Sequence, residues 1–292
     1  MIQLIASDMD GTLLNGNMEI PQANIDAIMH TYSLGIPFIV CTGRNFEEAK
    51  IVLNDAGIRC PIIGLNGAIA FDRDGTVDYE IPLADKEALA ILDRGRELGY
   101  YMEAMTSKNV YSSSRTQRIQ GITRLIQQMN VGMSQEEAET RATQSTEVTN
   151  IDYRDDLRDL INKEGQKIVK ITFTHQDPDR HLVPLKKELL QKFDDIYVTS
   201  SFKYNIEISQ THANKGAALK RYCQEHGYDL DHVLAIGDNY NDIPMLEIAG
   251  HSFAMENAVD AVKETAKYQA RSNNAAGLAG AIQEILDREK EG

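Results

Sequence analysis

The stretch DMDGTL, residues Asp8–Leu13, follows an apolar run at 2–6 that has the character of a buried strand. Residues two apart in extended backbone point the same way, so Asp8 and Asp10 can face one small volume at the end of that strand. Two carboxylates so close repel each other unless a cation or a shared proton compensates. A metal site with one carboxylate free to attack fits this pattern, and so does a strand followed by an ordinary Asp-Gly turn.

Alternating strands and helices surround this stretch at both ends of the chain. Such alternation predicts a parallel sheet with crossover helices, and therefore an α/β fold with a Rossmann-like, three-layer core. Ligands of such sheets bind at the carboxyl ends of the strands. The expected strands are 2–6, 37–41, 61–64, 233–236 and 251–255, and the expected helices are 21–34, 46–55, 214–226, 245–248 and 278–286.

The middle of the chain has a different pattern, which predicts an inserted α+β domain with a largely antiparallel sheet. We expect the core domain to comprise 1–83 and 209–292, and the insertion to comprise 84–208. A helix around Leu185 and Leu189 should have Pro184 in its first turn or before it, because proline disrupts a helix interior. The polar segment 136–150 has no clear pattern, although Ser134 and Glu137 resemble a capping box before it.

Composition limits the classes of partner. The 292 residues carry a net charge of −14, which argues against nucleic acid or an anionic membrane surface as the main partner. No apolar run approaches the ~20 residues of a membrane span, and no basic leader precedes the first strand. The three cysteines are too few and too widely spaced for a disulfide framework or a zinc site. We expect a cytoplasmic protein with reduced thiols.

Chemically useful residues gather where the expected strands end and one helix begins. These positions supply carboxylates, a hydroxyl, free backbone N–H groups, an amide and a cation, which is the set that phosphoryl transfer requires. Carboxylates can hold Mg²⁺, while hydroxyl, amide and backbone donors can hold a phosphate. A lysine at a helix start is not favoured by the helix dipole, which hints at another purpose. The residues are Asp8, Asp10, Thr42, Gly43, Lys215, Asp238, Asn241 and Asp242.

In these residues the chain resembles the haloacid-dehalogenase superfamily of phosphohydrolases. The motifs DxDGT at 8–12, Thr42 after the second strand, Lys215, and GDxxND at 237–242 occur in the family's order. The sequence NGA at 66–68 and the long insertion resemble the Cof-type branch, whose inserted cap is of the C2 type. For the cap, the resemblance is one of size and element pattern only.

The resemblance implies a role for each matching residue. Asp8 would be the nucleophile that becomes an aspartyl-phosphate, and it would also ligate Mg²⁺. Asp10 would protonate the leaving group and then deprotonate water, while its backbone carbonyl binds the metal. Asp238 would complete the metal site. The phosphate would be bound by the Met9 N–H, Thr42, the Gly43 N–H, Lys215 and Asn241. Asp242 would lie behind these residues and act either through water or by orienting Lys215. Arg44 either contacts substrate or lies on the surface, and Asn66 either lies near the site or only shapes a turn.

The implied function is a Mg²⁺-dependent phosphatase for a small phosphorylated metabolite, such as a sugar phosphate. The cap would close over the cleft and contact the leaving group. Two alternatives stay open at this point. One is a phosphomutase or a phosphatase dedicated to one disaccharide phosphate, and the other is a non-catalytic protein that binds phosphorylated metabolites.

Overall fold

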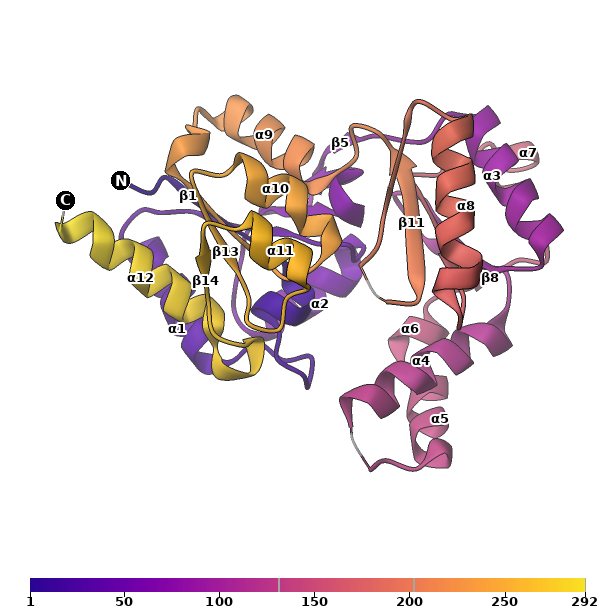
Figure 1. Ribbon diagram of the computed structural model, residues 1–292, viewed down its shortest axis with the longest axis horizontal. Coiled ribbons are helices and arrows are strands. Elements are labelled where there is room, and N and C mark those ends of the chain that lie inside the picture. Colours follow the sequence, from indigo (N-terminus) through magenta and orange to yellow (C-terminus); the bar gives the residue numbers. More distant parts are fainter. Residues whose placement is uncertain (131, 202, 292) are drawn as a thin grey trace. The chain divides into compact units, whose positions relative to one another are not determined.

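The computed structural model describes residues 1–130, 132–201 and 203–291. The chain forms two compact units, one made of Met1–Ile81 with His212–Gly292 and the other of Pro82–Thr211 (Figure 1). Both ends of the second unit are bonded within it. The Leu83 N–H donates to the Ile168 carbonyl at 2.8 Å, and the Thr211 N–H donates to the Asp195 carbonyl at 2.9 Å. The observed insertion is therefore slightly longer than the 84–208 expected from the sequence.

The first unit is built on an eight-stranded sheet in the order β14-β13-β12-β1-β2-β3-β4-β5. Neighbouring strands from β14 to β3 are parallel, and β4 and β5 add an antiparallel hairpin. The expected parallel α/β core is therefore confirmed. The strands are β1 Leu4–Ser7, β2 Phe38–Cys41, β3 Ile62–Gly64, β4 Ile69–Phe71, β5 Val77–Glu80, β12 Val233–Gly237, β13 His251–Ala254 and β14 Tyr268–Gln269.

Helices cover both faces of this sheet. Parallel crossovers are right-handed, and the chain moves one way from β1 to β3 but the other way from β12 to β14. Consequently α1 and α2 lie on one face, and α10 and α11 lie on the other. Helix α12 packs against α1, and α9 packs against α10, which completes three layers (Figure 1). The helices are α1 Gln22–Ser33, α2 Phe46–Asp55, α9 Lys215–His226, α10 Ile243–Ile248, α11 Asp260–Thr265 and α12 Gly277–Glu291.

The core of this unit is apolar on both sides of the central strands. All four residues of β1 and of β2 are buried, as a strand between two helix layers requires. Cys41, Cys60 and Cys223 are also buried and unbridged, and burial raises the pKa of each thiol. Because the central strands are packed between two helix layers, the side chains that follow their carboxyl ends have fixed positions.

The second unit has a six-stranded sheet in the order β10-β11-β9-β6-β7-β8. All neighbours are antiparallel except β7 and β8, so the sheet is mixed. The strands are β6 Tyr101–Met105, β7 Val110–Ser112, β8 Asp152–Tyr153, β9 Lys170–Thr174, β10 Ile196–Thr199 and β11 Asn205–Gln210. The helices are α3 Asp85–Leu98, α4 Arg115–Met129, α5 Gln135–Gln144, α6 Thr146–Thr149, α7 Asp159–Asn162 and α8 Pro178–Lys192.

Two details of the second unit differ from the sequence-based expectation. Pro184 was expected in or before the first turn of its helix, but α8 begins earlier, at Pro178, and Pro184 lies in its interior. Pro184 is exposed, so water can satisfy the carbonyl that its missing N–H leaves unpaired. The polar segment 136–150 is mostly helical, and α5 is capped by the Ser134 side chain, which accepts from the Glu137 N–H at 3.2 Å.

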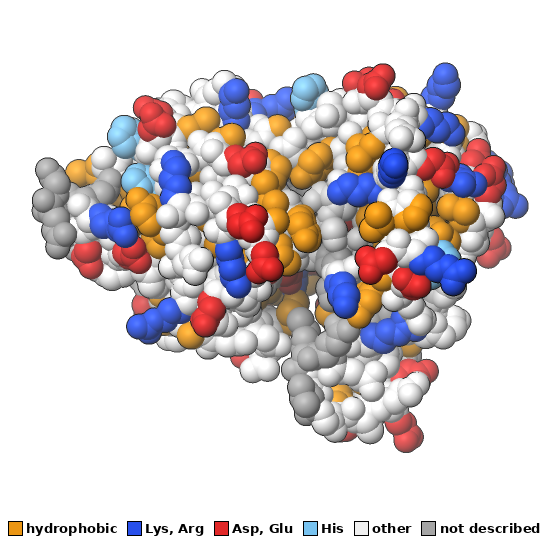
Figure 2. Space-filling model, viewed as in Figure 1, with side chains coloured by type: hydrophobic (Ala, Val, Ile, Leu, Met, Phe, Trp, Pro, Cys, Tyr) orange, Lys and Arg blue, Asp and Glu red, His pale blue; other side chains and the backbone are white. Residues whose placement is uncertain are grey.

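Charged side chains of both signs are interspersed on the face shown in Figure 2, without an extended field of Lys and Arg. This distribution agrees with the negative net charge of the chain. Among the described residues, no helix combines the length and apolar character that crossing a membrane requires.

Candidate functional site

Four neighbouring strands of the first unit end beside one another and present polar residues at one edge of the sheet. Asp8 follows β1, Thr42 follows β2, Asn66 comes shortly after β3, and Asp238 follows β12. Because these strands are parallel and adjacent, residues that are distant in sequence come together there. Asp8, Thr42 and Asn66 are buried, so the edge is a partly enclosed polar site.

The turn after β1 depends on a glycine. Gly11 has φ +76°, a left-handed conformation that glycine adopts without steric cost. A Cβ atom at this position would lie 2.4 Å from Asp238 Oδ2, so the missing side chain also lets that carboxylate approach. Thr12, in the same turn, donates its hydroxyl to Asp238 Oδ1 at 3.2 Å. The DMDGTL turn therefore holds Asp238 as well as Asp8.

Lys215 is the cation of the site. It is the first residue of α9, its side chain is fully buried, and its Nζ donates to Asp8 Oδ1 and to Asp242 Oδ1, each at 2.5 Å. Burial acts to lower the pKa of Lys215, but the nearby Asp242 and Asp8 carboxylates outweigh this effect and raise it. The lysine therefore stays charged between two carboxylates.

Asp242 holds this arrangement from behind. Its second oxygen, Oδ2, accepts from the N–H groups of Asp238 and Asn239 at 2.8 and 2.9 Å. Both of its carboxylate oxygens are thus engaged, one by Lys215 and one by the turn after β12. The sequence-based role for Asp242, orienting Lys215, is compatible with these contacts.

Asp8 sits in an unfavourable position for a negative charge. Burial, and then the Asp242 carboxylate, raise its pKa to about 7, against the opposing effect of Lys215. Burial and the Asp8 carboxylate likewise raise the pKa of Asp238. One lysine is therefore insufficient to compensate three clustered carboxylates, and a further cation would stabilise their ionised forms.

The spacing of these carboxylates suits a metal ion. Asp8, Asp238 and Asp242 each offer an oxygen, and the three oxygens lie within 4.8 Å of one another. An all-oxygen donor set of this kind fits Mg²⁺, which prefers carboxylates and keeps several waters. Asp242 was not expected as a direct ligand, and Asp10 was expected to contribute only its backbone carbonyl. The raised pKa values of Asp8 and Asp238 mark these two as the residues that a cation would benefit most.

Asp10 behaves differently from Asp8. Its side chain is 48% exposed, and Arg44 grips it with two hydrogen bonds, from Nε to Oδ2 at 2.8 Å and from a terminal nitrogen to Oδ1 at 2.6 Å. The Arg44 N–H also donates to the Thr42 hydroxyl at 3.1 Å, which fixes the start of the arginine. From the sequence, Arg44 was expected either to contact substrate or to lie on the surface. Its pairing with Asp10 was not predicted, because no sequence pattern links the two residues.

Asn66 and Asn241 form a second polar contact at the edge. The Asn241 Nδ2 donates to Asn66 Oδ1 at 3.0 Å, and both side chains are buried. Among the described residues, nothing bonds to Asn241 Oδ1, although this oxygen is buried. The pairing fixes the orientation of the Asn241 amide, and its unpartnered oxygen indicates that the site accommodates a further donor.

Asn66 lies in a strained loop that also positions Lys215. Leu65, Asn66 and Gly67 have φ values of +49°, +59° and +99° in succession. Such values are costly for the first two residues and persist only when the surroundings enforce them. Gly67 packs directly under the start of α9, since a Cβ there would lie 2.5 Å from the Asn214 carbonyl oxygen.

We expect Gly67→Ala to destabilise the protein by about 2 kcal/mol more than Gly57→Ala, since the added methyl would push Asn214 away. Gly57 is the matched control because it has φ +69° and open space around its missing Cβ, so its replacement incurs backbone strain alone. Urea unfolding of both variants measures the difference. Equal losses would show that Gly67 serves only the loop conformation.

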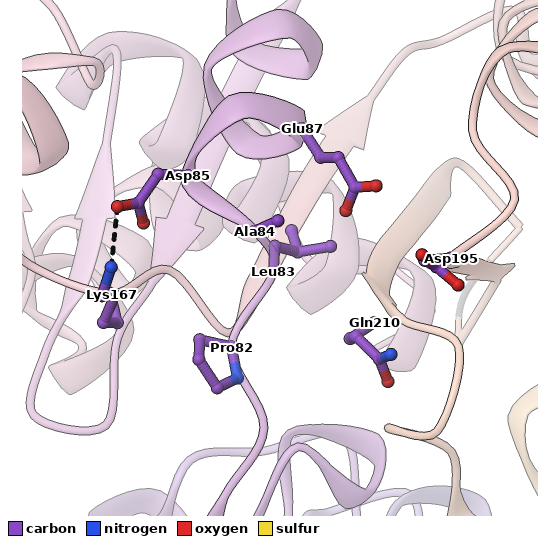
Figure 3. Close-up of a pocket in the computed structure, with 8 residues that line it drawn as sticks. All are labelled: Pro82, Leu83, Ala84, Asp85, Glu87, Lys167, Asp195 and Gln210. Atoms are coloured by element: carbon purple, nitrogen blue, oxygen red, sulfur yellow. Dashed lines mark hydrogen bonds and ion pairs between the residues drawn. The ribbon is translucent and has the colours of Figure 1, made fainter.

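A separate pocket of about 370 Å³ lies within the second unit. Figure 3 shows Asp85 and Lys167 pointing toward each other at one side, joined by an ion pair of 2.7 Å, with Glu87, Asp195 and Gln210 on the other side. The paired side chains are 43% and 54% exposed. None of the residues expected to act in catalysis lines this pocket.

Comparison with known proteins identifies the family. The sequence profile of the haloacid dehalogenase-like hydrolases matches residues 5–282. The chain belongs to this family. The resemblance to its Cof-type branch, drawn from the motifs, is thereby confirmed, and the chain is a phosphatase of the haloacid dehalogenase superfamily.

Relatives match along almost the full length of the haloacid dehalogenase-like chain. The 5-amino-6-(5-phospho-D-ribitylamino)uracil phosphatase YwtE of Bacillus subtilis is 31% identical over 98% of each chain. Phosphatase YwpJ of the same organism is 26% identical over 98% of this chain and 100% of the relative. The solved structure of a haloacid dehalogenase-like hydrolase from B. subtilis is 27% identical, covers 97% of this chain and 99% of its own, and has a TM-score of 0.86. That similarity also confirms the architecture of a parallel core sheet with a second mixed-sheet domain.

Proposed function

We propose that this phosphatase is Mg²⁺-dependent and hydrolyses a small phosphorylated metabolite through an aspartyl-phosphate, an acyl phosphate formed on Asp8. The observation that carries the proposal is the buried Lys215, bonded at 2.5 Å to both Asp8 and Asp242, with Asp238 adjoining. A buried cation shared by two carboxylates is expensive as mere structure. Such a cation is useful in a site that binds a dianionic phosphate, because it balances part of the phosphate's negative charge.

Asp8 is the proposed nucleophile. One of its oxygens, Oδ1, is engaged by Lys215, which leaves Oδ2 to attack phosphorus. Lys215 would then balance the negative charge that builds on the phosphoryl oxygens during transfer. The same lysine keeps Asp8 immobile, so the attacking oxygen and the phosphorus can be held in line.

The phosphoryl oxygens need hydrogen-bond donors, and the residues at this edge of the sheet supply several. The proposed set is the Thr42 hydroxyl, the N–H groups of Met9 and Gly43, Lys215, and the Asn241 amide. Thr42 is fixed by its position after β2 and by accepting from the Arg44 N–H. The amide of Asn241 has a second N–H besides the one donated to Asn66, and this N–H is free to reach a phosphoryl oxygen.

Asp10 is the proposed proton carrier. It would give a proton to the leaving oxygen and later take one from the water that hydrolyses the aspartyl-phosphate. In the structure Arg44 holds both oxygens of Asp10, so this pair must open or turn before Asp10 reaches a leaving group. Arg44 is thus proposed to position Asp10 rather than to bind the phosphate.

Asp8, Asp238 and the Asp10 backbone carbonyl would hold the metal, with Asp242 close behind. When bound, Mg²⁺ supplies positive charge that lets a phosphate approach these carboxylates. Asp10 is a competent base for water, which favours hydrolysis over the phosphomutase alternative. The non-catalytic alternative is disfavoured because nucleophile, lysine and metal-binding carboxylates are all present.

The substrate class is proposed from the relatives. Three of them are named as phosphatases of a ribitylamino-uracil phosphate, at 31%, 28% and 25% identity. A sugar phosphatase shares the fold at 19% identity, which by itself says nothing of substrate. A phosphomonoester of a sugar or a related polyol is therefore the class we propose, and the insertion is proposed to act as the cap that selects it.

Phosphate release from a panel of sugar and polyol phosphates, with p-nitrophenyl phosphate as a generic substrate, tests the proposal. We expect turnover in Mg²⁺ that EDTA abolishes and added Mg²⁺ restores. Isomerised product without released phosphate would establish the mutase instead. Absence of turnover on every substrate would refute the phosphatase proposal.

Metal binding should depend on pH through Asp8. In the metal-free protein, folded Asp8 keeps a proton up to about pH 7, whereas the unfolded chain loses it near the ordinary value of 3.8. The folded state therefore binds more protons in this window, and the free energy of unfolding falls as pH rises through it, by a few kcal/mol in order of magnitude. Mg²⁺ should offset this loss, so its stabilising effect should be larger at pH 8 than at pH 5.5.

Calorimetric unfolding in EDTA and in Mg²⁺ at these two pH values measures the effect. Asp8→Asn is the control, because it removes one titrating group and should reduce the pH dependence of the metal-free protein. A stabilisation by Mg²⁺ that is equal at both pH values would contradict the assignment of Asp8 as the titrating ligand.

A further inference from the structure

The turn after β1, which carries Asp8 and Asp10, contains a point of backbone freedom. Gly11 follows Asp10 directly, with φ +76° and ψ 0°. These two torsions set the direction of the Asp10 carbonyl relative to the Gly11 carbonyl, and glycine restricts them less than any other residue. The Asp10 carbonyl is one of the proposed metal ligands. A restraint from outside the turn is therefore needed to hold this carbonyl in one direction.

Asn257 supplies such a restraint. Its Nδ2 donates to the Gly11 carbonyl at 2.8 Å, although the two residues are 246 positions apart in the chain. This bond fixes the planar peptide unit between Gly11 and Thr12. The Thr12 hydroxyl holds the same unit from its other side by donating to Asp238 Oδ1 at 3.2 Å. Since β1 fixes the start of the turn, the peptide unit between them has little room to rotate.

The direction of the Asn257 amide is itself determined by a second asparagine. Its Oδ1 accepts from the Asn273 N–H at 3.0 Å, which leaves Nδ2 to face the Gly11 carbonyl. The Asn273 side chain is buried and donates its own Nδ2 to the Leu14 carbonyl at 2.8 Å, just after the same turn. An ionised carboxylate at position 257 could accept the first of these bonds but could not donate to Gly11. The position thus uses both functions of an amide.

The loop that carries Asn257 is also attached to the end of β12. It follows β13, and its Met255 N–H donates to the Gly237 carbonyl at 3.1 Å. Its Val259 N–H donates to the Asp238 carbonyl at 3.0 Å. Asn257 lies midway between these two anchor points in the sequence. One short loop therefore links the backbone around a proposed metal-binding carboxylate to the turn after β1.

We propose that Asn257 is a positioning residue for the metal centre, which fixes the direction of the Asp10 carbonyl relative to the Asp238 carboxylate. This inference rests on the proposed function, because the metal and its ligands belong to that proposal. Asn257 would touch neither substrate nor metal and would act through the backbone of Gly11. Mg²⁺ demands nearly ideal octahedral geometry, so a carbonyl that is free to rotate should bind it more weakly.

The alternative is that Asn257 makes an ordinary structural bond, and its exposure helps to separate the two roles. Asn257 is an exposed residue, and its bond to Gly11 is open to solvent. Water can replace a lost hydrogen bond at such a position, so removal of the amide should change Tm little. Water cannot hold the Gly11 carbonyl in one direction. The positioning role therefore predicts a loss of metal affinity in a protein that still folds normally.

Asn257→Ala removes the amide and leaves the backbone of the loop. We expect the Mg²⁺ concentration at half-maximal rate to rise about tenfold, the effect typical of residues that orient metal ligands. The KM for p-nitrophenyl phosphate at saturating Mg²⁺ should stay close to that of the wild type. A folding defect would lower the amount of active enzyme without changing the Mg²⁺ requirement. Asn54→Ala is the matched control, since Asn54 is an exposed asparagine of the same unit, on α2.

Two measurements need no turnover. Calorimetric titration with Mg²⁺ should give a dissociation constant about tenfold higher for Asn257→Ala than for the wild type and the Asn54 control. Hydrogen exchange of the metal-free proteins, followed in the peptide 8–14, should be faster in Asn257→Ala alone, because the turn loses its restraint.

An unchanged Mg²⁺ affinity in Asn257→Ala would overturn the inference, and so would an equal loss in Asn54→Ala. A rise in KM for substrate with no change in the Mg²⁺ requirement would also overturn it, since Asn257 would then serve substrate binding. Failure of the proposed function has a different signature, because it appears in the wild type. That protein would then bind no Mg²⁺ or release no phosphate, while hydrogen exchange would still show whether Asn257 restrains the turn.

Discussion

Asp8→Asn should abolish phosphatase turnover, with kcat falling by roughly 10⁴-fold or more, as expected when a catalytic nucleophile is removed. Asparagine has almost the same shape as aspartate, and it can still accept a hydrogen bond from Lys215 through its amide oxygen. The loss would therefore reflect the missing nucleophile and not a collapsed site. Steady-state release of phosphate from p-nitrophenyl phosphate in Mg²⁺ measures it.

The surface variant Asp26→Asn, on the exposed side of α1, is the matched control and should keep wild-type turnover. Trapping of the phosphoryl group on the protein adds a direct readout, because wild type quenched in acid should carry a labelled phosphate that Asp8→Asn lacks. If Asp8→Asn retained near-wild-type turnover, another residue would have to be the nucleophile.

Lys215→Met should damage both stability and activity. The structure places Lys215 Nζ at 2.5 Å from Asp8 and Asp242, so its removal leaves two buried carboxylates without their cation. Losing one partner from a buried ion pair costs about 3–5 kcal/mol. Activity should fall by about 10²–10³-fold as well, since the variant lacks one of the groups that stabilise negative charge on the transferring phosphoryl group.

Denaturant unfolding at pH 8 in EDTA measures the stability of the Lys215 variant. Lys220→Met is the matched control, because Lys220 lies on the same helix, α9, but is exposed. Protonation of the stranded carboxylates should reduce the difference at low pH. A Lys215→Met protein as stable as the Lys220 control would mean that solvent already compensates Asp8 and Asp242.

The edge of the sheet that holds the candidate site could be located from sequence because its signals are local. Each strand is a short apolar run, and each ends at a polar or glycine-containing stretch, so Asp8, Thr42 and Asp238 fall at strand ends whatever the details of packing. Adjacent parallel strands then bring these positions together. Helix boundaries such as Phe46–Asp55 were predicted for the same reason, from periodicity and a following glycine.

Interactions between distant residues could not be read in this way. The Arg44–Asp10 pair and the Asn66–Asn241 pair depend on side-chain directions at the sheet edge, which no periodicity encodes. The cross-strand alignment of Glu103, Thr172 and Glu207 depends on the register of the second unit's sheet, and a shift by one residue would bring different side chains together. Pro184 was predicted at or before the helix start because proline is unfavourable in a helix interior. Its exposed position in α8 makes that interior location tolerable, since water can bond the carbonyl that lacks a partner.

The insertion of one unit into the other has a consequence for how the protein is made. Strand β1 lies between β2 and β12, yet its partner residues in β12 begin only at Val233, after the whole of Pro82–Thr211. A ribosome therefore delivers the whole inserted unit while β1 still has one open edge. Lys215 emerges only after the inserted unit, and Asp242 only after β12, so Asp8 spends most of translation without its counterion.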